Sequence, residues 1–280
     1  MQLEKELKDL NLLDRFLFAE AMEDPEIVEM VLEILLGKEV VLKHLPQVEK
    51  EKRSTLWNRQ VKLDIWAMDE DETVYNAEVQ KKNTFNLPRR SRFYHSLIDS
   101  RLLKKGTIDF NELNDVYVIM IMPFDLFGKG LYQYTFRMEC EEIPGLRLED
   151  GAVRIFFNTH GRKPENMNPE LPALLRYFEH TTTETAEASS SKTIRKIHEK
   201  IQAIKADEEI GVKYMNAWEE KLMERQEGYE AGMKEGRFAG HREGSREKQK
   251  EIALKMKSRG ISLEEIAELT GLAPDEIEAL

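Results

Sequence analysis

The stretch that decides the fold runs from Val61-Lys62-Leu63-Asp64-Ile65-Trp66-Ala67-Met68, through an acidic joint at residues 69–72, to Thr73-Val74-Tyr75-Asn76-Ala77-Glu78-Val79-Gln80. Apolar and polar residues alternate in both segments, which predicts two strands joined by a hairpin loop. Pairing about a turn near residue 71 puts Asp64 opposite Glu78, roughly 4.5–5.5 Å apart at Cβ. Gln80 lies two residues beyond Glu78 and is therefore expected on the same face.

Two carboxylates at this separation repel each other unless a cation lies between them. Hard divalent cations prefer carboxylate, carbonyl and water oxygens, and Mg²⁺ is typically held by one or two carboxylates together with waters and substrate phosphate. The hairpin is therefore a candidate Mg²⁺ or Mn²⁺ site with Asp64 and Glu78 as the metal ligands. The competing interpretation is a solvent-facing hairpin whose wet face carries Lys62, Asp64, Asn76, Glu78 and Gln80.

Helices and further strands are predicted on both sides of the hairpin. Residues 10–36 should form two helices divided at Asp24-Pro25, because aspartate can cap a helix that begins with proline. A helix is expected over Pro88–Lys105, where apolar residues keep helical spacing. The remaining predicted elements are strands near Pro46–Lys52, Asp115–Met122, Leu131–Arg137 and Ala152–Asn158, and a helix over Pro169–His180.

Asp64, with Glu78-Val79-Gln80 fourteen positions later, resembles the active-site hairpin of the PD-(D/E)xK nucleases, and in particular their Rpn-type recombination-promoting nuclease or putative transposase branch. Two further segments carry the resemblance, which covers about residues 10–160. They are Asn11-Leu12-Leu13-Asp14-Arg15-Phe16-Leu17-Phe18, with the apolar helix that ends at Ile34-Leu35-Leu36-Gly37, and Arg89-Arg90-Ser91-Arg92-Phe93-Tyr94-His95.

The resemblance implies an α/β, restriction-endonuclease-like core, in which helices flank a mixed central sheet, and cleavage of DNA with a divalent metal. It makes Asp64 and Glu78 the metal ligands and places Gln80 at the third catalytic position, which is commonly lysine in that family. An amide cannot carry a positive charge or exchange a proton at neutral pH. Lys81 and Lys82 are candidates for the missing charge, although Lys81 should point to the opposite face.

Charge is unevenly distributed along the chain. The net charge is −11, but residues 81–105 carry eight Lys and Arg against Asp99 alone, a local balance of +7. A basic segment directly after a metal hairpin suits the binding of a phosphate backbone. We predict that this segment contacts DNA, the alternative being a solvated helix face with a half-packed tyrosine. The predicted DNA-binding residues are Lys82, Arg89, Arg90, Arg92 and Tyr94.

The sequence also bears on the compartment. One cysteine, Cys140, leaves no internal disulfide framework and fits a reducing cytosol, so we expect a cytoplasmic protein. The first residues lack the order of a signal peptide. The longest apolar run, Val116 to Phe124, is too short to cross a bilayer and predicts a buried strand instead, so no membrane partner is expected.

Three parts are predicted along the chain: a nuclease-like domain over 1–180, a polar linker and long charged helix over 181–250, and a small helix-turn-helix-like cap over 251–280. The linker is expected at Thr181–Ser191, where the composition turns polar. Glycine recurs every fourth residue from Gly228 to Gly244, and each glycine costs a helix roughly 1 kcal/mol relative to alanine. This row favours either self-association of the helix or a partly frayed tether, and we favour the tether.

The last segment, Ile252–Leu280, has residues that start and end short helices in the order expected of a helix-turn-helix. Gly260 should end one helix, the Ser262-x-x-Glu265 capping box should open a second, and Gly271 and Pro274 should separate it from a third. Residues 261–280 carry six acidic residues and no Lys or Arg, and phosphate would repel such a surface. A structural or protein-binding cap is therefore preferred to a DNA-reading unit.

Together these observations predict a Mg²⁺- or Mn²⁺-dependent DNA endonuclease with weak sequence preference, and the family resemblance implies a link to the recombination of mobile DNA. Asp64 and Glu78 would hold the metal, and Gln80 would orient the attacking water. A second hypothesis is a non-catalytic DNA-binding or protein-assembly factor that retains the nuclease fold, which Gln80 and the acidic net charge favour. A third is an interaction protein built on the long helix and the acidic tail.

Overall fold

The computed structural model describes the chain except for residues 1–4, 53–60, 104–105, 107 and 163–167, and for residues 49–52 and 61–64 it describes the backbone alone. The chain divides into two compact units, Met1–Tyr214 and Met215–Leu280. Within the described ranges, no helix combines the length and the apolar character that crossing a bilayer requires.

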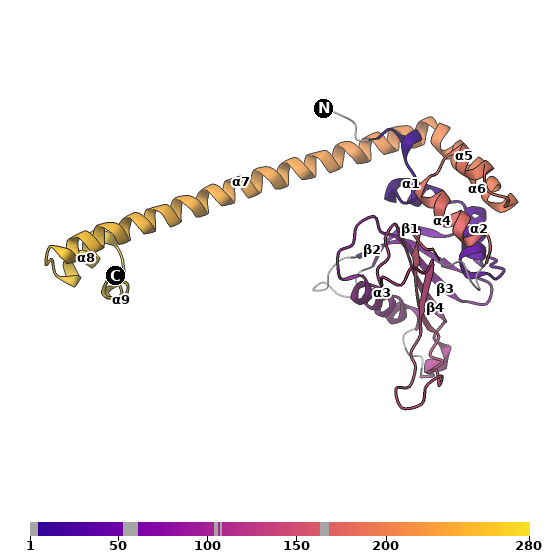
Figure 1. The fold of residues 1–280 in the computed structure, drawn as a ribbon, viewed down its shortest axis with the longest axis horizontal. Helices are drawn as coiled ribbons and strands as arrows, with labels where there is room; N and C mark the ends of the chain where they lie inside the picture. The colour runs from indigo at the N-terminus through magenta and orange to yellow at the C-terminus, as the bar shows by residue number, and fades with distance from the viewer. Residues whose placement is uncertain (1–4, 53–60, 104–105, 107, 163–167) are drawn as a thin grey trace. The chain divides into compact units, whose positions relative to one another are not determined.

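A six-stranded mixed sheet forms the centre of the first unit, in the order β1-β2-β3-β4-β6-β5 (Figure 1). β3 pairs in parallel with β4, and β4 with β6, whereas the other neighbours are antiparallel. The predicted hairpin is therefore β2–β3, beside a parallel core. The strands are β1 (Gln47–Lys52), β2 (Val61–Met68), β3 (Val74–Val79), β4 (Val116–Met122), β5 (Gln133–Phe136) and β6 (Ala152–Asn158).

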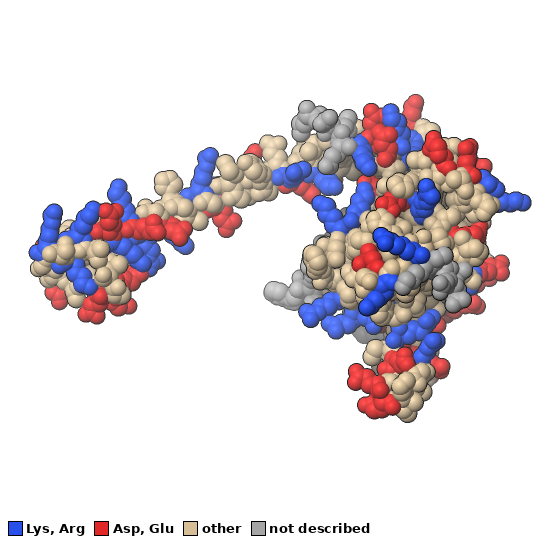
Figure 2. Space-filling model, in the orientation of Figure 1, with Lys and Arg blue, Asp and Glu red and all other residues tan. Residues whose placement is uncertain are grey.

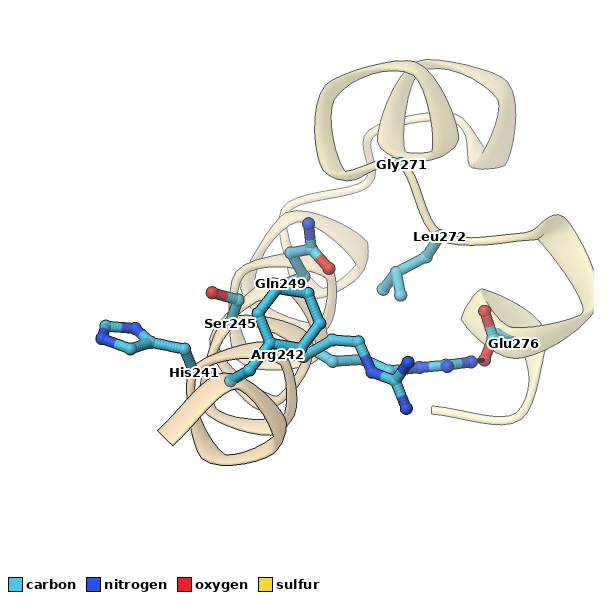
Figure 3. A pocket seen from close by; sticks show the side chains of 9 residues that line it. His241, Arg242, Ser245, Gln249, Gly271, Leu272 and Glu276 are labelled. Carbon is cyan, nitrogen blue, oxygen red and sulfur yellow. Dashed lines mark hydrogen bonds and ion pairs between the residues drawn. The ribbon is translucent and has the colours of Figure 1, made fainter. Parts of the chain in front are cut away.

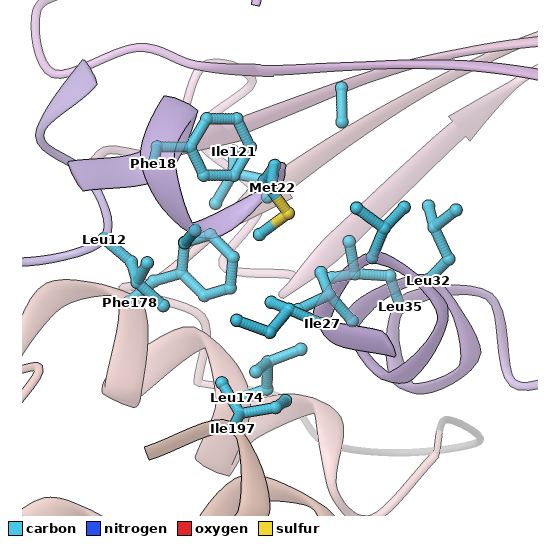
Figure 4. Packing of buried hydrophobic residues seen from close by; sticks show 14 of the residues in the cluster. Leu12, Phe18, Met22, Ile27, Leu32, Leu35, Ile121, Leu174, Phe178 and Ile197 are labelled. Carbon is cyan, nitrogen blue, oxygen red and sulfur yellow. The ribbon is translucent and has the colours of Figure 1, made fainter. Parts of the chain in front are cut away.

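One face of the sheet is covered by four helices that share the larger hydrophobic core (Figure 4). They are α1 (Arg15–Ala21), α2 (Pro25–Leu36), α4 (Leu171–Glu179) and α6 (Lys192–Ala206). The Asp24 side chain accepts a hydrogen bond of 2.9 Å from the Glu26 N–H, and Pro25 begins α2, as the sequence predicts. Gly37 ends α2 in the left-handed conformation, which glycine adopts without steric cost.

The prediction that Thr181–Ser191 forms a linker is wrong, because this segment is part of the first unit. It contains α5 (Thr183–Glu187), whose Ala186 is fully buried in the larger core. Two of its polar residues are helix caps: the Thr182 hydroxyl accepts from the Thr185 N–H, and the Ser191 hydroxyl accepts from the Ile194 N–H. The first unit therefore continues past residue 180, through α6, to Tyr214.

The opposite face of the sheet is covered by α3 (Leu87–Leu102), the helix predicted over Pro88–Lys105. A second hydrophobic core joins Leu87, Tyr94 and Leu97 of this helix to the facing side chains of β3 and β4, among them Val74 and Met120. Because side chains alternate along β3, the residues that share this face with Val74 are Asn76 and Glu78. The helix that follows the hairpin thus covers the predicted metal site. Two short 3₁₀ helices, Leu7–Asp9 and Phe110–Glu112, complete the unit.

The second unit contains most of α7 (Glu208–Ser258) together with α8 (Leu263–Thr270) and α9 (Pro274–Glu278). Its small core is formed by Ala253, Ile266, Leu272 and Ile277. The Ser262 hydroxyl accepts from the Glu265 N–H, and Gly271 ends α8 in the left-handed conformation, at the positions that the sequence predicts. α7 is helical throughout the glycine row.

A pocket of about 520 Å³ lies between α7 and the α8–α9 turn (Figure 3). Arg246 and Glu276 form an ion pair across it. The pocket thus marks a joint inside the second unit. Its walls are formed by Phe238, His241, Arg242, Ser245, Arg246, Gln249, Gly271, Leu272 and Glu276.

Candidate active site

The register of the β2–β3 hairpin determines which residues can meet. Ile65 pairs with Ala77 and Trp66 with Asn76. This register is centred near residue 71, and continued by one step it would set positions 64 and 78 opposite each other. Asp64 lies in β2, but its side chain is outside the described residues.

Glu78 is a buried carboxylate with only 2% of its surface exposed, and Asn76, on the same face, is completely buried. The Asn76 amide donates from Nδ2 to the Ile65 carbonyl (2.9 Å) and to Glu78 Oε1 (3.3 Å). The acceptor Oδ1 of Asn76 is buried and has no hydrogen-bond partner among the described residues. The wet-face interpretation is therefore wrong for these two residues, because α3 covers them.

Arg90 reaches Glu78 from α3. Its Nη2 lies 3.5 Å from Glu78 Oε2, and its guanidinium carbon lies 5.3 Å from the centroid of the Tyr94 ring. The side chain of Arg90 is 28% exposed, and its Nε is buried with no hydrogen-bond partner in the part of the chain that is described. Tyr94 is buried in the second core, whereas Arg89 and Arg92 are exposed on the same helix.

Gln80 follows the end of β3 and is half-buried. Its backbone N–H donates to the Ile121 carbonyl (2.9 Å), and its side-chain Nε2 donates to the Lys82 carbonyl (2.8 Å). Lys81 points to the other face, as predicted, where its ammonium lies 2.7 Å from Asp14 Oδ2. Lys82 is exposed. The described contacts thus bring Arg90, rather than Lys81, to Glu78.

His95 and Asp99, which also lie on α3, add no positive charge to the site. His95 and Asp99 lie one turn apart with 3.6 Å between Nε2 and Oδ2. Burial lowers the pKa of His95, which favours its neutral form, and burial raises the pKa of Asp99. The positive charge that α3 contributes here is therefore that of its arginines.

The donor set suits a hard divalent cation. It comprises the Glu78 carboxylate, the buried Oδ1 of Asn76 and, if the register continues by one step, an aspartate position opposite Glu78, so all of its ligands would be oxygens. Among the described side chains, which exclude that of Asp64, no group of three or more His, Cys, Asp or Glu is arranged to hold a metal. A metal would thus depend on the pairing of Asp64 with Glu78.

Residues 14–228 match the family model of the PD-(D/E)XK nuclease family transposases. The chain belongs to this family. The match confirms the resemblance and the restriction-endonuclease-like fold, and it extends past residue 180 as the first unit does. Membership implies a nuclease- or transposase-related function, and nucleases of this family generally use divalent metals and act on DNA. No curated protein and no solved structure matches the chain.

Two residues contact Glu78 that the sequence does not single out for this position. Asn76 belongs to the wet face in the solvent-facing interpretation, but its spacing of two from Glu78 places both on one side of β3. Arg90 was grouped with the other basic residues of its segment. Its position four residues before Tyr94, one helical turn, was the available signal that it lies over an aromatic ring facing the sheet.

Proposed function

We propose that this chain is a metal-dependent DNA endonuclease that hydrolyses phosphodiester bonds with weak sequence preference and promotes recombination of mobile DNA. The observation that carries the proposal is the buried carboxylate of Glu78 in the hairpin of a PD-(D/E)XK nuclease family chain, at the position that the register, continued by one step, would set opposite residue 64. A carboxylate is rarely buried to this degree unless it meets a cation; Arg90 is one such partner in the structure, and a metal ion would be a second one in the working enzyme.

Asp64 and Glu78 would hold Mg²⁺ or Mn²⁺. When bound, the metal supplies a water of lowered pKa and polarises the scissile phosphate. Gln80 is suited to orient the attacking water through Oε1, because its Nε2 is already engaged with the Lys82 carbonyl. Attack by the water oxygen on phosphorus breaks one P–O bond; one product keeps the phosphate, and the departing sugar oxygen takes up a proton.

The exposed basic side chains near the site would hold the DNA backbone. Lys82, Arg89 and Arg92 are exposed around the start of α3. Figure 2 shows basic side chains over the visible face of the first unit with acidic ones between them, so DNA binding would depend on local charge. Contacts with phosphates carry no base information, which supports weak sequence preference. Arg90 and Tyr94 turn inward and fit a role at the reacting phosphate better.

Plasmid cleavage tests the proposal. Purified full-length protein should nick or linearise supercoiled plasmid with Mg²⁺ or Mn²⁺ and should be inactive in EDTA. Asp64→Ala and Glu78→Gln should each lower the rate by about 10² or more, since each removes a metal ligand. Glu70→Gln is the matched control, because Glu70 is an exposed acid in the same hairpin. Equal cleavage by the wild type and Asp64→Ala across metals contradicts the proposal.

A non-catalytic DNA-binding or assembly factor is the second candidate. The amide at position 80 and the net charge of −11 favour it. In that case DNA retention in a mobility-shift assay would be indifferent to EDTA and to Glu78→Gln, and no plasmid would be cut. A cytoplasmic location, expected from the single cysteine, stays a prediction.

Self-association through α7 is also proposed. Gly228, Gly232 and Gly236 line a groove of about 640 Å³ with Tyr229 and Met233. Five pairs of opposite charges stand at equal distances on either side of Gly236. Two of them, Lys221 with Glu251 and Arg225 with Glu247, lie within about 60° of Gly236 around the helix, so an antiparallel second copy centred there would bring these charges to their opposites. The pairs are Lys221 with Glu251, Glu224 with Lys248, Arg225 with Glu247, Glu230 with Arg242, and Glu235 with Arg237.

A further inference from the structure

The third catalytic position of the site holds Gln80, and an amide has no positive charge to offer a phosphate. We propose that Arg90 supplies this charge, and that its guanidinium binds the scissile phosphate beside Glu78. The inference rests on the nuclease function proposed above and assigns Arg90 a place in the reaction rather than a general contact with the DNA backbone.

The contacts of the nearby basic side chains show why Arg90, and not Lys81 or Lys82, is the candidate. Lys81 is drawn to the opposite face of the sheet by Asp14, 2.7 Å away, at the beginning of α1. Lys82 is exposed, and its carbonyl accepts the Gln80 side chain. Arg90 Nη2, by contrast, lies 3.5 Å from a Glu78 oxygen. Arg90 is thus the member of this basic segment whose cationic group the described contacts bring to the proposed metal ligand.

The guanidinium is held in place by what surrounds it. The ring of Tyr94 lies one helical turn away with its centroid 5.3 Å from the guanidinium carbon, within the range of a cation–π contact. Tyr94 and Leu87 are buried in the second core, so the start of α3 cannot rotate without unpacking it. A cation held by packing is pre-positioned for charge that develops during the reaction.

The guanidinium also has donors left for a ligand. An arginine carries five N–H donors, and the contact with Glu78 employs the Nη2 end of the group. The Nε–H is buried without a hydrogen-bond partner among the described residues, so the donors that DNA could reach are those of the Nη atoms, on a side chain that is 28% exposed. A phosphate oxygen is the acceptor that a nuclease substrate brings, and guanidinium groups match phosphate geometry with two parallel hydrogen bonds.

The arrangement places two cations at one carboxylate. Glu78 meets Arg90 in the protein alone and would meet the metal as well in the working enzyme. The charge of Arg90 therefore opposes metal binding while it favours the reaction of bound DNA. Removing that charge should move the two quantities in opposite directions: the metal should bind more tightly, and cleavage at saturating metal should slow.

The experiment compares full-length wild type, Arg90→Gln and Arg90→Lys, with Arg176→Gln as the matched control. Arg176 is exposed on α4, a helix that covers the other face of the sheet, and its substitution removes the same charge. Mn²⁺ affinity without DNA is measured by titration calorimetry, and single-turnover plasmid cleavage is measured at saturating Mn²⁺. A double variant, Gln80→Lys with Arg90→Gln, tests rescue by returning a charge to the strand position.

For Arg90→Gln we expect Mn²⁺ to bind roughly three- to tenfold more tightly and cleavage to fall about 10²-fold. Arg90→Lys should keep the wild-type affinity for Mn²⁺ and lose about tenfold in rate, since an ammonium lacks the two-pronged geometry. The double variant should recover cleavage over Arg90→Gln, and Arg176→Gln should match the wild type in both measurements.

Wild-type rates for both Arg90 variants overturn the inference and leave the nuclease function standing. Loss of both Mn²⁺ binding and cleavage in Arg90→Gln, without recovery in the double variant, overturns it in favour of a structural role. If Arg90→Gln does not fold, the rate of Arg90→Lys decides. A wild type that neither binds Mn²⁺ nor cuts DNA overturns the proposed function itself, and this outcome is recognised before any variant is compared.

Discussion

Truncation of Ile197 to alanine should strongly destabilise the first unit, which carries the nuclease-like fold. Residue 197 lies outside residues 1–180, the range that the sequence predicts for this domain. Ile197 is on α6 and completely buried. Figure 4 draws it in one cluster with Leu174 of α4 and Ile27 of α2. Ile197→Ala removes three carbons, worth about 0.8 kcal/mol each in transfer free energy, and leaves a cavity between three helices.

The transfer part amounts to about 2.4 kcal/mol, and the cavity brings the expected loss in free energy of unfolding to about 3–4 kcal/mol. For a unit of this size the thermal midpoint should fall by roughly 6–16 °C, at about 2–4 °C per kcal/mol. Urea denaturation of the full-length chain, followed by circular dichroism, measures the loss. Ile108→Ala is the control, because Ile108 is 92% exposed in the same unit and its truncation should stay within about 0.5 kcal/mol of the wild type.

Coincident unfolding curves for Ile197→Ala and Ile108→Ala would refute the reasoning, because α6 would then contribute nothing to the core. The same packing predicts that a chain ending at residue 180 does not unfold cooperatively, since it would lack the α6 side chains that complete the core. A chain ending at Tyr214 should unfold in a single transition, because it contains the whole first unit.

Three further perturbations test other parts of the molecule. Burial lowers the pKa of His198, whose Nδ1 lies 2.8 Å from the Tyr177 hydroxyl, so the folded state binds this proton less readily than the unfolded state. The thermal midpoint of the wild type should therefore fall as the pH drops from 7.5 through about 6.5 to 5, and that of His198→Gln should fall less; parallel curves contradict this. Asn76→Ala removes the donor to Glu78 and a buried oxygen, so calorimetry should show Mn²⁺ binding weakened by about tenfold or more, and an unchanged affinity excludes Asn76 from the metal site. Gly236→Leu should convert a dimer into a monomer in size-exclusion chromatography with light scattering, because a bulky side chain separates the paired helices; a variant that stays dimeric is incompatible with pairing at the glycine row.

Signals confined to a few neighbouring residues made most of the fold predictable. Asp24 and Pro25 mark the beginning of α2 by their own backbone preferences, and the β6 prediction, Ala152–Asn158, needed no correction. The error at 181–191 arose because composition does not show what a polar side chain binds. The Thr181 hydroxyl accepts from the Leu12 N–H, 169 residues away, and donates to the Tyr177 carbonyl. A long-range bond of this kind leaves no trace in local composition.

The candidate site was predictable to the extent that it depends on strand alternation and turn position. These two rules place residues 64 and 78 opposite each other and send Lys81 to the other face, where Asp14 meets it. Alternation also places Asn76 beside Glu78, but burial of that face depends on α3, which the hairpin sequence does not contain. A polar residue in a two-faced strand is therefore ambiguous until the covering helix is known.

The packing of α3 also decides which way the Arg90 side chain points. The segment after the hairpin has basic residues at several helical positions, and charge alone does not distinguish them. Packing does, because Leu87 and Tyr94 must face the second core, and an arginine one turn before Tyr94 then lies over β3 while Arg89 and Arg92 face solvent. A long side chain on a covering helix can thus reach a strand carboxylate, so a positive charge beside Glu78 does not require lysine at position 80. Glutamine at position 80 is consequently weak evidence against catalysis. The absence of arginine at position 90 would be strong evidence against it.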